Sequence, residues 1–317
     1  MMNREEFYDA LREAVENAVS EGVKRQGRFV IQEIQKNNDV TLHGITLQLN
    51  EGGTSPIMYL ERYFEAYENG KSMKEIAVEL KQEYEMYFWK RPAIKMEDFS
   101  FDKVLDKVFF KVIDRKMNRK KLQEVKNTPI ENGFAFVYSI YVNENASIPI
   151  TRTLAEDMTY DMKKIHEAAI KNTPNFYPAT LENMEDVLFG QLENNGEAKN
   201  LLQTDRVGST PFGMLVLSND EKHLGASALY YPGVKEKVSD VIKGDYYVIP
   251  SSIHEVIIIP KKGEFNAVKL EEMVREVNEN TVDPIDRFSD RVLLYDSKRK
   301  KLITEAEPIK NNDERGR

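Results

Sequence analysis

The sequence contains no cysteine among its 317 residues. This absence excludes disulfide bonds, thiolate nucleophiles, thiolate-ligated zinc and iron–sulfur clusters. A reducing compartment is the natural location of such a chain. We therefore expect a cytoplasmic protein that is soluble without a metal or a cofactor.

Long apolar runs are also missing. No stretch approaches the roughly 18 consecutive apolar residues that a membrane-spanning helix needs. Residues 1–15 carry charges where a signal peptide has its apolar core. We expect no association with a membrane.

Histidine is scarce, with four in the chain, and the familiar catalytic motifs are absent. There is no GxxxxGK[ST] phosphate-binding run, no GxGxxG fingerprint and no GxSxG nucleophile elbow. His166 and Glu167 begin a zincin-like pattern, but Ile170 stands where the second histidine is needed. His43 and His223 have no obvious partner in the sequence, and we interpret them as surface or turn histidines. The common nucleotide-binding and hydrolase classes thus lose their main support.

Carboxylates, by contrast, are abundant. A carboxylate pair becomes a general acid and base only where burial separates the two pKa values, and burial is not visible in a sequence. One acidic series lacks the turn glycine and the closing glutamate of an EF-hand. We interpret these residues as loop and cap carboxylates and expect no metal site; they are Glu182, Glu185 and Asp186 in one group and Asp283, Asp286 and Asp290 in the other.

The formal net charge of −8 opposes nonspecific binding to nucleic acid or to anionic lipid. Two basic clusters exist, but neither is interleaved with the aromatic residues of a single-strand binding platform. We interpret them as solvated helix and turn faces, and nucleic acid is not an expected partner. The clusters are Arg115, Lys116, Arg119, Lys120 and Lys121, and then Lys298, Arg299, Lys300 and Lys301.

Periodicity predicts an N-terminal module, 1–195, of α+β character. Apolar residues at helical spacing predict an opening helix that ends at Gly27, and turn residues at 36–39 predict a β-hairpin. Helices are predicted from Ser55 and from Ser72, the second with a capping box. β-Branched and aromatic residues predict strands at 108–113 and 134–142, followed by further helices, one of which starts at Thr180.

A polar, glycine-bearing stretch at 190–200 is the best candidate for a linker, and 204–304 forms the predicted C-terminal module. The predicted order in this module is β-α-β-β-α-β. This is the order of a split βαβ, ferredoxin-like layer, in which two helices cover one face of a sheet. Residues 306–317 are charged, lack large apolar groups and are expected to form a flexible tail.

Several segments taken together are similar to an uncharacterised family, a domain of unknown function found in anaerobic Gram-positive gut bacteria and often carried on mobile elements. The resemblance implies a bacterial cytoplasmic protein and supplies no activity. It covers nearly the whole chain and rests on SPIMYLERYFEAYENG, NTPIENGFAFVYSIYV, NTPNFYPATLENMEDVLFG, GASALYYPG, YYVIPSSIHEVIIIP and MVREVNENTVDPIDRFSDRVLLYD.

One stretch remains a candidate site. Ser251, Ser252, His254 and Glu255 lie together between two apolar runs. Our primary interpretation is a hairpin turn whose serine hydroxyls make local hydrogen bonds. The alternative is a hydrolase or transferase site, since a nucleophile and a base need only be adjacent in space.

For the whole protein we favour a non-enzymatic role in binding another protein, given the missing catalytic signatures and the many tyrosines. A nucleic-acid accessory factor that uses the two basic clusters is a weaker alternative.

Overall fold

The computed structural model describes residues 2–92, 94, 96–143, 146–193, 199–203, 213–261 and 267–304. The chain divides into two compact units, Met1–Ser100 and Phe101–Arg317. The predicted boundary near residue 195 thus differs from this division, and independent folding of 204–304 stays a prediction. The centre of the predicted linker (194–198) and the predicted tail (306–317) lie outside the described residues.

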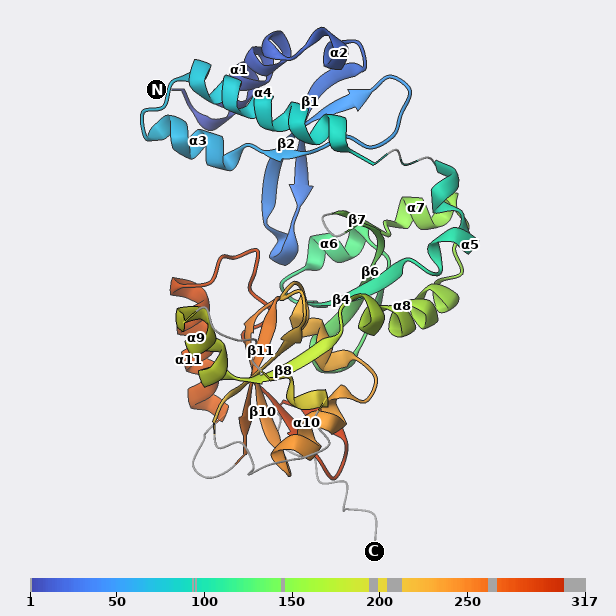
Figure 1. Ribbon diagram of the computed structural model, residues 1–317, viewed down its shortest axis with the longest axis vertical. Helices are drawn as coiled ribbons and strands as arrows, with labels where there is room; N and C mark the ends of the chain where they lie inside the picture. The colour runs from blue at the N-terminus through green and yellow to red at the C-terminus, as the bar shows by residue number, and fades with distance from the viewer. Residues whose placement is uncertain are drawn as a thin grey trace, which may run out of the picture. The chain divides into compact units, whose positions relative to one another are not determined.

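The first unit is a three-stranded antiparallel sheet packed against helices (Figure 1). The strand order is β1-β2-β3, and the long β1–β2 hairpin pairs Gly27 with Leu49 and Gln35 with Thr41. The elements are α1 (Arg4–Ala18), α2 (Glu21–Lys24), β1 (Gly27–Gln35), η1 (Asn37–Asp39), β2 (Thr41–Leu49), β3 (Met58–Tyr59), α3 (Glu61–Glu68), α4 (Met73–Lys90) and η2 (Met96–Phe99).

Local chemistry explains most of these boundaries. Asn38 and Asp39 adopt positive φ values of 59° and 54°, which asparagine and aspartate tolerate, and they turn the predicted hairpin. The predicted capping box of Ser72 and Glu75 opens α4. The predicted cap at Ser55 is wrong. Its hydroxyl instead meets the Tyr84 hydroxyl at 2.6 Å, and α3 begins only after β3 has paired with β2.

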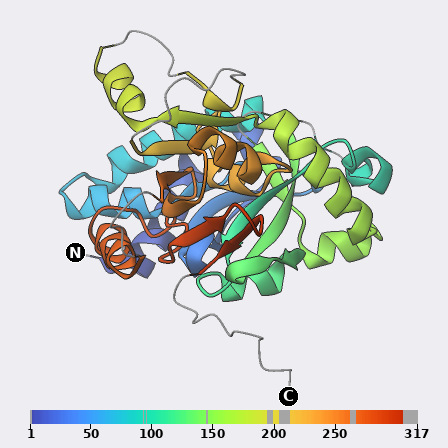
Figure 2. The same ribbon diagram turned by 90° about the horizontal axis from the view of Figure 1, so that it is seen from below.

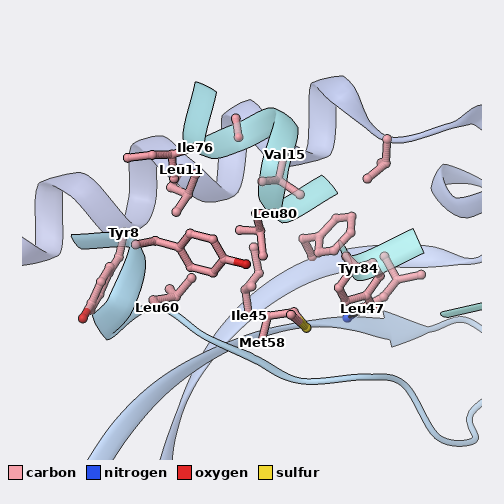
Figure 3. Packing of buried hydrophobic residues seen from close by; sticks show 14 of the residues in the cluster. Tyr8, Leu11, Val15, Ile45, Leu47, Met58, Leu60, Ile76, Leu80 and Tyr84 are labelled. Atoms are coloured by element: carbon pink, nitrogen blue, oxygen red, sulfur yellow. Dashed lines mark hydrogen bonds between the residues drawn. The ribbon is translucent and has the colours of Figure 1, made fainter. Parts of the chain in front are cut away.

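The core of the first unit lies between the sheet and the helix pair α1–α4. Figure 3 shows Leu11 and Val15 of α1, Leu80 and Tyr84 of α4, and Ile45 of β2 converging on one another. All five side chains are 0 % exposed. The buried Tyr84 hydroxyl accepts a hydrogen bond from the Leu47 N–H at 2.9 Å, which satisfies a polar group inside the core.

The second unit combines two antiparallel sheets. The first contains β4, β6, β5 and β7, and α8 packs along β4 (Figure 2). Its elements are α5 (Phe101–Val104), β4 (Val108–Asp114), α6 (Arg119–Glu124), β5 (Asn127–Pro129), η3 (Glu131–Gly133), β6 (Phe134–Asn143), β7 (Ala146–Pro149), α7 (Arg152–Asp157) and α8 (Met162–Phe176).

The second sheet has six strands in the order β13-β12-β10-β11-β9-β8. Its strand β8 takes the place of the first residues of the helix predicted from Thr180, because Ala179–Asn183 pairs with β9, and the helix starts at Met184 instead. The elements are β8 (Ala179–Asn183), α9 (Met184–Glu193), η4 (Leu201–Gln203), β9 (Leu215–Asn219), η5 (Gly225–Tyr230), α10 (Val234–Ile242), β10 (Tyr246–Ser252), β11 (Glu255–Pro260), α11 (Ala267–Asn280), β12 (Leu293–Asp296) and β13 (Lys301–Ile303).

The α+β class is confirmed, but the ferredoxin-like arrangement is not formed. In that arrangement the last strand lies beside the first, whereas β12 pairs with β10, and β8 occupies the position beside β9. The helices also cover opposite faces. Leu270 and Val274 of α11 pack on Tyr247, while the Tyr246 hydroxyl donates to the Lys235 carbonyl of α10 at 3.1 Å. Both faces of β10 are apolar, so each face needs its own cover.

Candidate functional site

The stretch Ser251 to Glu255 forms the end of the β10–β11 hairpin. Strand β10 runs through Pro250 to Ser252, and β11 starts at Glu255, so the turn consists of Ile253 and His254. The turn is thus shorter than predicted. The register shifts between Pro250 and Ser252.

Three hydrogen bonds to its backbone fix this turn to the rest of the second unit. The Ile253 N–H donates to the Asp286 carbonyl at 2.7 Å, and the Ile253 carbonyl accepts from the Ala226 N–H at 3.2 Å. The Ser218 hydroxyl donates to the His254 carbonyl at 2.7 Å. The hairpin end is therefore held by β9, by η5 and by the segment that precedes β12.

Both ring nitrogens of His254 have partners. The Leu224 N–H donates to His254 Nδ1 at 3.3 Å, which leaves the proton on Nε2. His254 Nε2 lies 3.5 Å from an Asp286 carboxylate oxygen. The imidazole therefore connects Leu224 with Asp286. From the sequence, Asp286 was interpreted only as a loop or cap carboxylate.

The two serine hydroxyls point to other groups. Ser252 Oγ accepts from the His254 N–H at 3.0 Å, and Ser251 Oγ donates to Glu255 Oε1 at 3.3 Å. A nucleophile–base pair needs the hydroxyl against a ring nitrogen. The contacts formed here are instead those of a hydrogen-bonded turn.

A second histidine packs beside this turn. The rings of His223 and His254 are 5.5 Å apart between centroids. Burial lowers the pKa of His223, electrostatic interactions with His254 and Lys111 lower it further, and Asp286 acts in the opposite direction. His223 is therefore neutral at neutral pH and adds no charge to the turn.

We expect His254→Ala to lower the free energy of unfolding by about 1 kcal/mol, the scale of one lost hydrogen bond. The reason is that Leu224 loses its side-chain acceptor. Chemical denaturation followed by circular dichroism measures the effect, and Ser251→Ala, which removes only the contact between the two strand ends at Glu255, gives a comparison on the same hairpin. An unchanged denaturation curve together with loss of a hydrolase or transferase activity would contradict the turn interpretation.

The other two histidines also have specific partners. His43 Nδ1 lies 3.1 Å from Glu61 Oε1, and the same oxygen accepts from the His43 N–H at 2.7 Å. His166 Nδ1 meets the buried Tyr138 hydroxyl at 2.8 Å. Both pairs join elements that are distant in sequence, and neither partner is adjacent to its histidine along the chain.

The described residues include no group of three or more histidine, aspartate or glutamate side chains that could hold a metal ion. Across the same part of the chain, no helix is long and apolar enough to cross a membrane. The first basic cluster extends from the end of β4 into α6, and the second extends from the turn after β12 to the first residue of β13, Lys301. There Arg299 pairs with Asp296 at 3.6 Å.

An apolar surface that the sequence analysis missed lies on α4. Val78, Met86 and Trp89, which we call the α4 strip, are 44 %, 46 % and 57 % exposed. They occupy the side of the helix opposite the buried Leu80 and Tyr84. The signal was present in the sequence as a second apolar series at spacings of eight and three residues, on the face that the core series leaves to solvent.

The α4 strip sits on a fixed part of the first unit. Glu85 accepts a hydrogen bond from the Ser20 N–H at 2.6 Å and pairs with Lys81 at 3.1 Å. One edge of the Trp89 indole lies against α2, because a Cβ added at Gly22 would be 3.4 Å from the ring. Contacts with Ser20 and with α2 therefore hold this side of α4 in place.

Comparison with known proteins gives a family and no activity. No curated protein matches the chain, and no solved structure does. Residues 4–297 match the model of a family of unknown function, DUF5688. This match covers nearly the whole chain, which therefore belongs to the DUF5688 family.

Proposed function

We propose that the chain is a non-enzymatic protein-binding module and that the α4 strip is its contact surface. The observation that carries this proposal is the exposure of the single tryptophan, Trp89, beside Met86 on the outer face of a packed helix. Tryptophan and methionine are enriched in protein interfaces, and tryptophan is prominent among the residues that contribute most binding energy.

The α4 strip suits a protein partner better than a nucleic acid. Gln82, between Val78 and Met86, is neutral, and the nearby Lys81 is already paired with Glu85. A single-strand platform combines aromatic residues with unpaired cations along its groove. The partner that fits is a protein with an aliphatic face and a pocket for an indole ring. A cytoplasmic location, supported by the cysteine-free sequence, is part of the proposal.

The test places a photo-crosslinking amino acid at position 86 of the full chain, in the native host. We expect one discrete crosslinked protein from this position. The matched control carries the same amino acid at Leu188, which is 55 % exposed on α9, and should give no such product. Equal products from both positions, or a crosslink only to a second copy of this chain, would contradict the proposal.

With the crosslinked partner purified, Trp89→Ala should weaken its binding roughly thirty-fold, which corresponds to about 2 kcal/mol for an interface hot spot. The tryptophan is more than half exposed, so the fold should survive the change, and circular dichroism checks this. Emission from Trp89 should shift to shorter wavelength on binding, because the indole leaves water. The rival hypothesis, a hydrolase or transferase at Ser251 to Glu255, predicts instead that Ser251→Ala abolishes function and Trp89→Ala does not.

A further inference from the structure

Strand β1 lies at an open edge of its sheet. The order β1-β2-β3 leaves it paired only with β2, and all nine residues Gly27–Gln35 take part in that pairing. The strand contains no proline. Long edge strands without proline are templates for pairing with another strand.

The backbone groups at this edge follow from the contacts of β2. The His43 N–H donates to Glu61 and the His43 carbonyl accepts from the Leu60 N–H, so both groups point away from β1. Glu33 is the register partner of His43, and in such a pair both residues direct their groups outward. Phe29, Ile31 and Glu33 therefore present their N–H and C=O groups at the free edge. None of the described residues hydrogen-bonds to these groups.

The edge strands of the second unit differ from β1, because side chains hydrogen-bond to their outward backbone groups. At the edge of β4, the N–H groups of Phe110 and Val112 donate to the hydroxyls of Thr173 and Ser227, each at 3.0 Å. At the edge of β8, the side chain of Asn200 makes the two hydrogen bonds that a neighbouring strand would otherwise make. This side chain accepts from the Leu181 N–H at 3.1 Å and donates to the Ala179 carbonyl at 3.0 Å.

The remaining edges of that unit are covered in two other ways. At β13, Asn132 donates to the Leu302 carbonyl at 3.1 Å. Strands β5 and β7 end in Pro129 and Pro149, each at a position that faces outward, because the next residue donates its N–H inward to β6. Proline there has no N–H to offer. The uncapped edge of β1 contrasts with all of these.

We propose that the free edge of β1 pairs antiparallel with β1 of a second copy of this chain, with the twofold axis at Val30. The side chains of the strand are self-complementary in this register. Val30 lies opposite Val30 of the second copy and Phe29 opposite Ile31, while Arg28 lies opposite Gln32. Apolar residues thus meet apolar residues, and no like charges are opposed.

The neighbouring registers are less favourable. A twofold axis at Ile31 places Arg28 opposite Ile34 and Phe29 opposite Glu33. An axis at Gln32 places Arg28 opposite Lys36, a like-charge pair that destabilises a strand pairing. Registers shifted by a single residue are not available, because the outward groups belong to every second residue. This surface is separate from the α4 strip, and the inference does not depend on the proposed function.

A disulfide test is direct because the chain has no cysteine of its own. In the proposed pairing the two Val30 residues form a non-hydrogen-bonded pair with Cα atoms about 4.5 Å apart, within the range that a disulfide spans. Oxidation of full-length Val30→Cys should therefore give a covalent dimer. Gln32→Cys, four residues from its own symmetry mate or about 14 Å away, should not. Equal yields from the two variants, or no dimer from either, would overturn the proposal.

The second test removes one N–H from the edge. Glu33→Pro deletes an outward donor without breaking the β1–β2 ladder, whereas Glu33→Ala changes the side chain and keeps the donor. By light scattering, the wild type and Glu33→Ala should reach twice the chain mass of 36.7 kDa, and Glu33→Pro should remain at the monomer mass while its circular dichroism spectrum stays that of the folded protein. The proposal fails if the wild type is monomeric at its highest soluble concentration, or if Glu33→Pro folds and still dimerises. It also fails if the outward N–H groups of β1 are protected from hydrogen exchange only when a different protein is bound.

Discussion

Replacing Asp114 with alanine is expected to lower the free energy of unfolding of the second unit by about 3 kcal/mol, because it removes the buried acceptor of several hydrogen bonds and one partner of a partly buried ion pair. The Asp114 side chain is only 4 % exposed and lies 2.6 Å from Arg291 Nη2. It also accepts from the Ser289 hydroxyl at 2.8 Å and from the Lys116 N–H at 2.7 Å. Its loss leaves these donors without their acceptor and leaves the guanidinium beside the Phe134 ring without a counter-charge.

Chemical denaturation of Asp114→Ala, read by circular dichroism, measures this cost. The matched control is Lys235→Ala, which removes the more exposed pair between Lys235 and Glu131 at 3.3 Å. Such pairs contribute about 1 kcal/mol or less. If Asp114→Ala cost no more than this control, Asp114 would not be a buried anchor of the second unit.

The second large effect is expected at Gly225, the first residue of η5. A Cβ at this position would overlap the Ser218 hydroxyl and the His254 carbonyl oxygen, and would lie 2.8 Å from the Asn219 nitrogen. Two of these atoms belong to backbone that is already held in β9 and in the hairpin, so they have little freedom to move. Gly225→Ala should therefore cost about 3 kcal/mol, at the upper end for overpacking, or prevent folding.

Soluble yield and thermal melting together measure the Gly225→Ala effect. Gly213→Ala is the control, because a Cβ at Gly213 meets nothing within 4 Å, and the change should stay within about 0.5 kcal/mol. A Gly225→Ala protein that melts like the wild type would show that η5 and the hairpin end can separate without cost. That result would also weaken the assignment of His254 to a fixed turn.

Sequence reasoning succeeded where the cause of a structure lies within a few residues. The Asn38 turn, the Ser72 capping box and the apolar face of α4 each depend on neighbours along the chain. The start of the helix predicted from Thr180 failed for the opposite reason. Met184, Val187 and Leu188 do lie in a helix, α9, but Thr180 belongs to β8 and pairs with Ser218, a residue that no local pattern associates with it.

The strand order of the second unit was out of reach for the same reason. The β-α-β-β-α-β pattern along the chain is compatible with several strand pairings. In the structure β8, which lies outside that pattern, pairs with β9 and takes the edge position beside it. One clue was visible: four apolar residues, 256–259, follow one another in β11, which indicates burial on both faces. A layer with both helices on one face does not provide this.

The candidate site was foreseen only in outline. The hairpin end was expected at Ser251 to His254, and the structure places the turn at Ile253 and His254. Its partners are a backbone N–H 30 residues away, at Leu224, and the side chain of Asp286. Backbone donors carry no sequence signature, and one carboxylate among many gives no sign of its partner. The exposure of Trp89 likewise depends on which face of α4 the sheet covers.

The ion pair between Asp114 and Arg291 also sets an order of events during synthesis. The two residues are 177 positions apart, so at about 5–20 residues per second the ribosome needs roughly 9–35 s to deliver the arginine after the aspartate. The first unit, by contrast, is built from residues Met1–Ser100. During that interval Asp114 lacks its arginine partner, whereas every residue of the first unit has already been synthesised. This interval is when chaperones have the most apolar surface of the second unit to recognise.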